Sequence, residues 1–138
     1  MTITTFEDAR TAIYGRLKAG WADSNASVLV EYQNRQTVDL DAQQAPFVTC
    51  DIVFNDGEQI GLGSAPGQRY HGAVWLTVWT REGGGVAVAN GYLSALALLF
   101  GMAQFDGVNT KAVRPLPSQQ SKGWAIESIR IPFWIDQI

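Results

Sequence analysis

The sequence contains little cysteine, histidine or charge. Its 138 residues include one cysteine, Cys50, and one histidine, His71. A single cysteine excludes a disulfide within the chain, and one cysteine with one histidine cannot supply the four ligands of the usual structural zinc site. Charged residues make up 17% of the chain, below the ~25% of a typical soluble domain. The low charge indicates that part of the surface is covered by another protein.

Basic residues are also scarce, because 10 Lys and Arg stand against 13 Asp and Glu, giving a net charge of -3 and a pI near 5.0. This balance disfavours nucleic-acid binding, which normally needs a basic surface. The first five residues lack the basic start and apolar run of a signal peptide, which predicts an intracellular protein. Residues 83–105 carry no charge, but their glycines and polar residues argue against a membrane span.

Two segments have the spacing of amphipathic helices. The first is expected from Thr5 to about Ala19, with Thr5 and Asp8 forming a capping box and Gly20 ending the helix. The second is expected over 86–104, after a run of three glycines. The apolar positions that recur every three or four residues are Phe6, Ala9, Ile13, Leu17 and Trp21 in the first helix, and Leu93, Leu96, Phe100 and Ala103 in the second.

Strands are predicted between and after these helices. Asn55-Asp56-Gly57 predicts a hairpin turn, and the polar segment 34–46 predicts a protruding loop or long hairpin. Because hairpin connections dominate, we expect a single α+β domain over residues 1–138, with two helices packed on a mainly antiparallel sheet. The segments with strand-like alternation are 28–32, 47–54, 58–63, 70–80, 108–113 and 124–134.

No group of residues predicts catalysis. A serine or cysteine nucleophile needs a base within reach, and only His71 could serve, with Cys50 as its neighbour. We interpret Cys50 instead as a small core residue. Asp39 and Asp41 could share a divalent ion, but exposed loop acids are seldom liganded, and the glycine-rich segment 61–67 has proline where a nucleotide-binding turn needs glycine. We expect no catalytic residue, no cofactor and no metal.

Five tryptophans are more than a core of this size needs. Trp75 and Trp79 fall on one face of the strand expected over 70–80. They either form part of an interface, where Trp is enriched, or lie beneath a helix. Both interpretations are compatible with the pattern.

The second half of the chain has a recognisable order of motifs. Tyr70 and Gly72 begin an aromatic strand, Gly83–Gly85 follow it, and an alanine-rich helix ends near Phe100. The closing strand carries Trp124, Ile129, Ile131, Pro132 and Phe133. Over about residues 60–134, this order resembles the tail terminator-like proteins of long-tailed bacteriophages.

The resemblance implies a structural virion protein without enzymatic turnover. Its subunits would close into a homo-hexameric ring on the head-proximal end of the tail tube and stop tube polymerisation. The implied partners are other copies of the chain, the tail tube protein and a head-completion or connector protein. The implied location is the junction of tail and neck, after assembly in the host cytoplasm. DNA would pass through the ring without specific binding, and no membrane is involved.

The resemblance also implies roles for particular residues. Fold-supporting roles fall to Gly72, Gly84, Gly85, Pro132 and Phe133. For contacts with a ring neighbour or the tube we expect the loop 34–44, and the residues proposed for the interface are Arg35, Asp39, Asp41, Trp75 and Trp79. Two other functions remain open. One is another neck component, such as a head-tail joining or tail-completion protein. The other is a small hydrolase or ligand-binding domain, which would need a pocket holding His71 and an acid.

Overall fold

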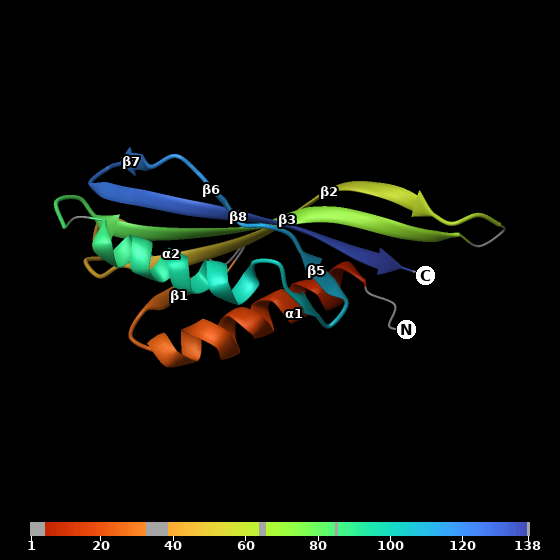
Figure 1. Ribbon diagram of the computed structural model, residues 1–138. Helices are drawn as coiled ribbons and strands as arrows, with labels where there is room; N and C mark the ends of the chain where they lie inside the picture. The colour runs from red at the N-terminus through yellow and green to blue at the C-terminus, as the bar shows by residue number, and fades with distance from the viewer. Residues whose placement is uncertain (1–4, 33–38, 64–65, 85, 138) are drawn as a thin grey trace.

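The protein is built on one curled sheet with two helices against one of its faces (Figure 1). The computed structural model describes residues 5–32, 39–63, 66–84 and 86–137. The predicted α+β fold class is confirmed. The helices are α1 (Phe6–Leu17) and α2 (Ala87–Phe100), and the strands are β1 (Leu29–Tyr32), β2 (Phe47–Ile60), β3 (Gly67–Arg81), β4 (Gln104–Phe105), β5 (Val108–Thr110), β6 (Arg114–Pro115), β7 (Gln119–Ser121) and β8 (Trp124–Gln137).

Strand β3 lies at the centre of the sheet. The strand order is β1-β2-β3-β8-β5-β4, and the short strands β6 and β7 also pair with β8. Only the β1–β2 pair is parallel among the described strands. Because β3 pairs antiparallel with both β2 and β8 along its length, it fixes the register of the long strands.

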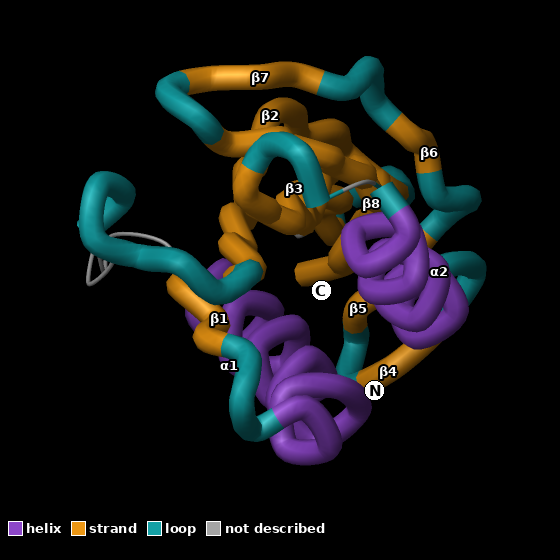
Figure 2. Tube along the Cα trace, turned by 90° about the vertical axis from the view of Figure 1, so that its left-hand side faces the viewer, coloured by secondary structure: helices purple, strands orange, loops and turns teal. Residues whose placement is uncertain are grey.

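The main core lies between the sheet and the helices. Val74, Leu76 and Val78 alternate along β3 and pack into this core, whereas the residues between them face the other side of the sheet. Figure 2 shows α1 and α2 on the same side of β2 and β3, with β7 on the opposite side. We refer to the side without helices as the outer face. The helix residues that are buried in the core are Ala9, Ile13, Leu17, Trp21, Ala89, Leu93, Leu96 and Phe100.

The first helix begins as predicted, but the helical path continues past its predicted end. The Thr5 hydroxyl accepts a bond from the Asp8 N–H at 3.0 Å, and the Asp8 carboxylate accepts one from the Thr5 N–H at 3.2 Å. The chain does not leave the helical path at Gly20 but continues through a π-helical turn, Lys18–Ala22, and a 3-10 turn, Asp23–Asn25. A Cβ at Gly20 would lie 2.4 Å from Leu99 Cδ1. This glycine therefore permits close packing on α2 rather than ending the helix.

The predicted hairpin turn at Asn55-Asp56-Gly57 is wrong. Strand β2 runs through these residues to Ile60, and the connection to β3 lies at residues 61–66. Phe54 pairs with Gly72 and Asp56 with His71, so Asn55 is the extra residue of a β-bulge. A sequence that usually forms a turn therefore lies within a strand, where it shifts the pairing register between β2 and β3.

Other element ends also differ from the prediction. Helix α2 ends at Phe100, because the Thr110 hydroxyl donates to the Phe100 carbonyl oxygen and accepts from the Ala103 N–H. The segment 115–122, between two of the expected strands, carries Pro115 of β6 and the whole of β7, which continue the sheet beyond β8. Strand β8 extends to Gln137 and β5 ends at Thr110.

The positions expected to support the fold have different environments. Gly72 is the tightest, because a Cβ there would lie 2.4 Å from the Val53 carbonyl oxygen and 2.8 Å from Phe133 Cζ. Phe133 is fully buried, and Pro132 pairs with Ala73 on the outer face. A Cβ at Gly84 would meet only the Arg81 carbonyl oxygen, at 3.5 Å, and Gly85 lies outside the described residues.

Replacing Gly72 by alanine should destabilise the protein. Because the new methyl group meets backbone on one side and a buried ring on the other, Gly72→Ala is expected to lower the free energy of unfolding by about 2 kcal/mol or more. The control is Gly91→Ala on α2, where no atom lies within 4 Å of the added Cβ and helix propensity favours alanine by about 1 kcal/mol. Urea unfolding measures both variants. Equal stability of the two would contradict the close approach.

Candidate interaction surface

Helix α2 exposes apolar side chains and has no charged residue. Val88 is 45% exposed and Leu98 is 87% exposed, and Met102, just beyond the helix, is 77% exposed. Gly91 and Ala95 are also exposed and lie between Val88 and Leu98 at helical spacing, so the four form one stripe. We call Val88, Gly91, Ala95, Leu98 and Met102 the α2 stripe. An uncharged apolar stripe on a surface helix is typical of a protein contact.

Trp79 belongs to a small second core on the outer face. Its ring stacks on Phe47 with 5.4 Å between centroids, and the Trp124 ring meets Phe47 edge-on at 5.2 Å. The Trp79 indole N–H donates to the Thr49 hydroxyl at 3.3 Å. The interpretation that Trp75 and Trp79 lie beneath a helix is therefore wrong, because both helices pack on the opposite face of β3.

Trp75 lies near the middle of the outer face and is only partly buried. The Arg130 guanidinium lies 5.9 Å from its ring centroid. Further along, Arg69 lies 4.0 Å from the Trp134 ring and forms an ion pair with Asp136 at 2.8 Å. The centre of this face therefore combines aromatic rings with arginines, a composition that is enriched at protein interfaces. The interface role of Trp75 stays a prediction.

The described part of the loop before β2, residues 39–46, is attached to the sheet. The Arg81 guanidinium donates to three backbone carbonyl oxygens, those of Leu40, Asp41 and Gln43, at 2.7, 3.3 and 2.6 Å. The same guanidinium lies 4.2 Å from the Trp124 ring, whose indole N–H donates to the Leu40 carbonyl oxygen at 3.1 Å. Residues 39–43 therefore contact one end of the outer face, and of the predicted loop only this part and its continuation to Pro46 are described.

The charged residues proposed for this loop have local roles where they are described. The Asp39 carboxylate accepts the Asp41 N–H at 3.0 Å, which closes a tight turn. Both acids are exposed, and Arg35 lies outside the described residues. No group of three or more His, Cys, Asp or Glu side chains suited to a metal occurs in the described part of the chain.

His71 does lie beside an acid, but not beside a nucleophile. Its Nε2 is 2.9 Å from a Glu58 carboxylate oxygen on the outer face. Cys50 lies on the opposite face of the sheet, in the main core, and is fully buried. Burial raises the pKa of the Cys50 thiol far above its usual value. The predicted alternative of a Cys50–His71 pair is therefore wrong, and the thiol is unsuited to nucleophilic attack.

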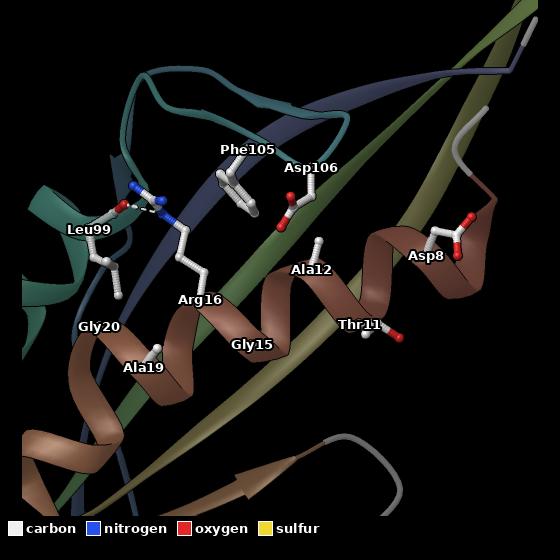
Figure 3. A pocket seen from close by; sticks show the side chains of 10 residues that line it. All are labelled: Asp8, Thr11, Ala12, Gly15, Arg16, Ala19, Gly20, Leu99, Phe105 and Asp106. Carbon is white, nitrogen blue, oxygen red and sulfur yellow. Dashed lines mark hydrogen bonds between the residues drawn. The ribbon is translucent and has the colours of Figure 1, made fainter. Parts of the chain in front are cut away.

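A groove of about 690 Å³ runs along α1 toward the β4–β5 turn (Figure 3). Arg16 lies within the groove between Leu99 and Phe105, because its Nε donates to the Leu99 carbonyl oxygen at 2.8 Å and its guanidinium lies 4.6 Å from the centroid of the Phe105 ring. Much of the wall is formed by small residues, including Gly15 and Ala19. Asp8 and Asp106 are its acids, and Asp8 is already used in the helix cap. Arg16 and Asp8 already form structural hydrogen bonds. The groove therefore lacks a pair of groups that could act as acid and base.

Comparisons with known proteins extend the fold assignment but not the function. No protein-family model and no curated protein matches the sequence. A solved structure whose name states no function is similar over 95% of each chain, with a TM-score of 0.71 and 16% identity. At this identity the similarity establishes the fold alone. Among the described residues, no helix has the length and apolar character required to span a membrane.

Sequence reasoning missed two features of this surface. The α2 stripe was missed because the sequence pattern identified only the core-facing positions of this helix, whereas about half of the described residues in the run 83–105 are exposed. The sequence did contain a signal for the stripe, because Leu98 and Met102 are apolar but do not fall on the helix face predicted to be buried. The attachment of the loop by Arg81 had no sequence signal, because it depends on backbone carbonyls that are some forty residues away.

Removing the Arg81 guanidinium should release the loop. Arg81→Gln loses its bonds to the carbonyl oxygens of residues 40, 41 and 43, at a cost of about 2 kcal/mol in the free energy of unfolding. Limited proteolysis should then cut the loop faster than in the wild type. Arg114→Gln, at an exposed arginine, serves as the control. Unchanged cleavage in Arg81→Gln would show that other contacts attach the loop.

The Cys50 thiol should be unreactive in the folded protein. Because it is fully buried and its pKa is raised by burial, an aromatic disulfide reagent at neutral pH should label it only after unfolding in urea. A Ser94→Cys variant, which adds an exposed thiol on α2, should react at once with one equivalent. Rapid labelling of the wild type would mean that the main core opens readily.

Proposed function

We propose that this protein is a structural subunit that closes into a ring on the head-proximal end of a phage tail tube. The observation that carries the proposal is the α2 stripe, an uncharged apolar surface in which Leu98 is 87% exposed. A monomer gains nothing from such a surface, whereas an assembly buries it. The ring would end tube growth and offer a surface to head-completion or connector proteins at the tail–neck junction of the virion, without catalytic turnover.

The distribution of surfaces supports a ring over a symmetric pair. A ring needs two different patches on each subunit, because each copy contacts one neighbour with one patch and the next neighbour with the other. The α2 stripe and the outer face lie on different sides of the molecule (Figure 1). Each such contact should bury on the order of 800 Å² per subunit.

The motifs that resemble tail terminator-like proteins have packing roles, which is what a structural protein requires. Gly72 and Phe133 contact one another across the β3–β8 pair. The candidate chemistry is weak by comparison, since the His71–Glu58 pair is on the exposed outer face and the thiol is buried. These observations favour assembly over hydrolysis.

The native mass tests the proposal most directly. Sedimentation over a range of concentrations, with and without purified tail tubes, should give a species near six times the 15.1 kDa subunit mass. Negative-stain images should then show closed rings with a central hole, and added protein should stop tube elongation. A stable symmetric dimer that leaves tube growth unchanged would overturn the proposal.

A charge placed on the α2 stripe should impair assembly without unfolding the subunit. Leu98→Glu is expected to abolish the ring, because burying a carboxylate in an apolar contact is costly, while the free energy of unfolding of the subunit stays within about 0.5 kcal/mol of the wild type. The matched control is Leu62→Glu, at a leucine that is 95% exposed near the end of the β2–β3 hairpin. Sedimentation and urea unfolding of both variants provide the measurement. Rings formed equally well by Leu98→Glu would exclude the stripe from the contact.

A further inference from the structure

One row of residues across the middle of the outer face changes sign from one edge of the sheet to the other. Asp51 on β2 pairs with Trp75 on β3, Trp75 with Arg130 on β8, and Arg130 with Arg114 on β6. Directly paired residues project to the same face of a sheet, so these four form one row. The row begins with an acid at the β2 edge and ends with two arginines at the β6 edge.

More acids lie along the β2 edge. The bulge at Asn55 turns Asp56 and Glu58 to the outer face, because each pairs with an outer-face residue of β3. Asp56 is exposed, and Glu58 is 55% exposed although it contacts His71. Strand β2 itself carries three acids, Asp51, Asp56 and Glu58, and no basic residue. The β2 edge is therefore acidic.

The opposite edge is basic. Lys111, Arg114 and Lys122 are exposed, and no acid lies between residues 107 and 126 of the sequence. None of these three cations forms an ion pair within the described residues. Arg114 moreover pairs directly with Arg130. Like charges directly opposite one another on neighbouring strands are destabilising, so this pair favours an acidic partner from outside the subunit.

Within the described residues, both edges also leave backbone groups without a strand partner. From Asp51 to Ile60, β2 pairs only with β3 among the described strands, since β1 ends at its pairing with Cys50. Among the described residues, strands β6 and β7 pair only with β8. Every residue of these two strands is exposed. Open strand edges accept further strands or loops of another chain.

We propose that the acidic β2 edge of one copy binds the basic β6–β7 edge of the next copy, head to tail. The proposal rests on the proposed ring function and adds a charged edge contact between neighbouring subunits to the apolar contact made by the α2 stripe. A second copy is the partner that fits, because each chain carries both signs on separate edges. Two copies related by a two-fold axis would place acid against acid. Head-to-tail contact repeats the same interface from copy to copy, as a ring requires.

Charge reversal on each edge tests the contact. One variant carries Asp51→Lys with Asp56→Lys, and the other carries Lys111→Glu with Arg114→Glu. Each alone should need at least about tenfold more protein to assemble at low salt, because like charges then face one another. An equimolar mixture should assemble as the wild type does, since the reversed edges match each other and the unchanged edges match each other. Sedimentation velocity gives the readout.

Two further variants control for folding and for charge reversal away from the two edges. Asp56→Lys with Glu58→Lys changes only exposed acids of the same edge and should behave like the first variant even if the change at the half-buried Asp51 impairs folding. Lys18→Glu with Asp23→Lys changes exposed residues after α1 and should assemble normally.

The outcomes separate this contact from the ring function. A mixture that assembles no better than its components overturns the edge contact, and so does normal assembly of both variants alone. A wild type that stays monomeric at its highest soluble concentration in low salt also overturns it. If the wild type forms rings that these changes leave intact, only the edge contact fails. If the edges join copies into open chains that never close or stop tube growth, the ring function fails and the contact stands.

Discussion

The alternation of side chains along β3 is the constraint on which the rest of the structure depends. Strand β3 pairs with β2 on one side and β8 on the other over most of its length. One set of its side chains fills the core beneath α1 and α2, and the other set forms the outer face. Because the helices supply only one covering layer, the outer face keeps tryptophans and arginines that are only partly buried. The protein thus has an internal core and an uncovered surface that are built from the same strand.

The elements with strong local signals could be predicted from the sequence. Thr5 and Asp8 located the start of α1, and the alternation from Tyr70 onward located β3. The fold class followed from the order of these elements. Local signals worked here because capping and alternation involve residues that are close in sequence.

The rest of the structure depended on contacts between distant residues. Asn-Asp-Gly favours a hairpin turn in isolation. Here β2 pairs with β3 on both sides of this sequence, so it forms a β-bulge instead. Arg81 attaches a loop that precedes it by some forty residues. The candidate surfaces were predicted only in part. Trp75 was placed correctly on a strand face, but which face the helices would cover depended on packing, and the interface role of the predicted residues stays a prediction.

The acidity of β2 has a consequence for the free subunit in the cell. A strand with one long open edge is a template on which identical strands can add without limit, which leads to fibrils. Here Asp51 and Asp56 lie on that strand, so two copies that approach through this edge repel each other. The same charges leave the strand accessible to a cationic surface. Addition of identical strands at this edge, the first step toward a fibril, is therefore disfavoured.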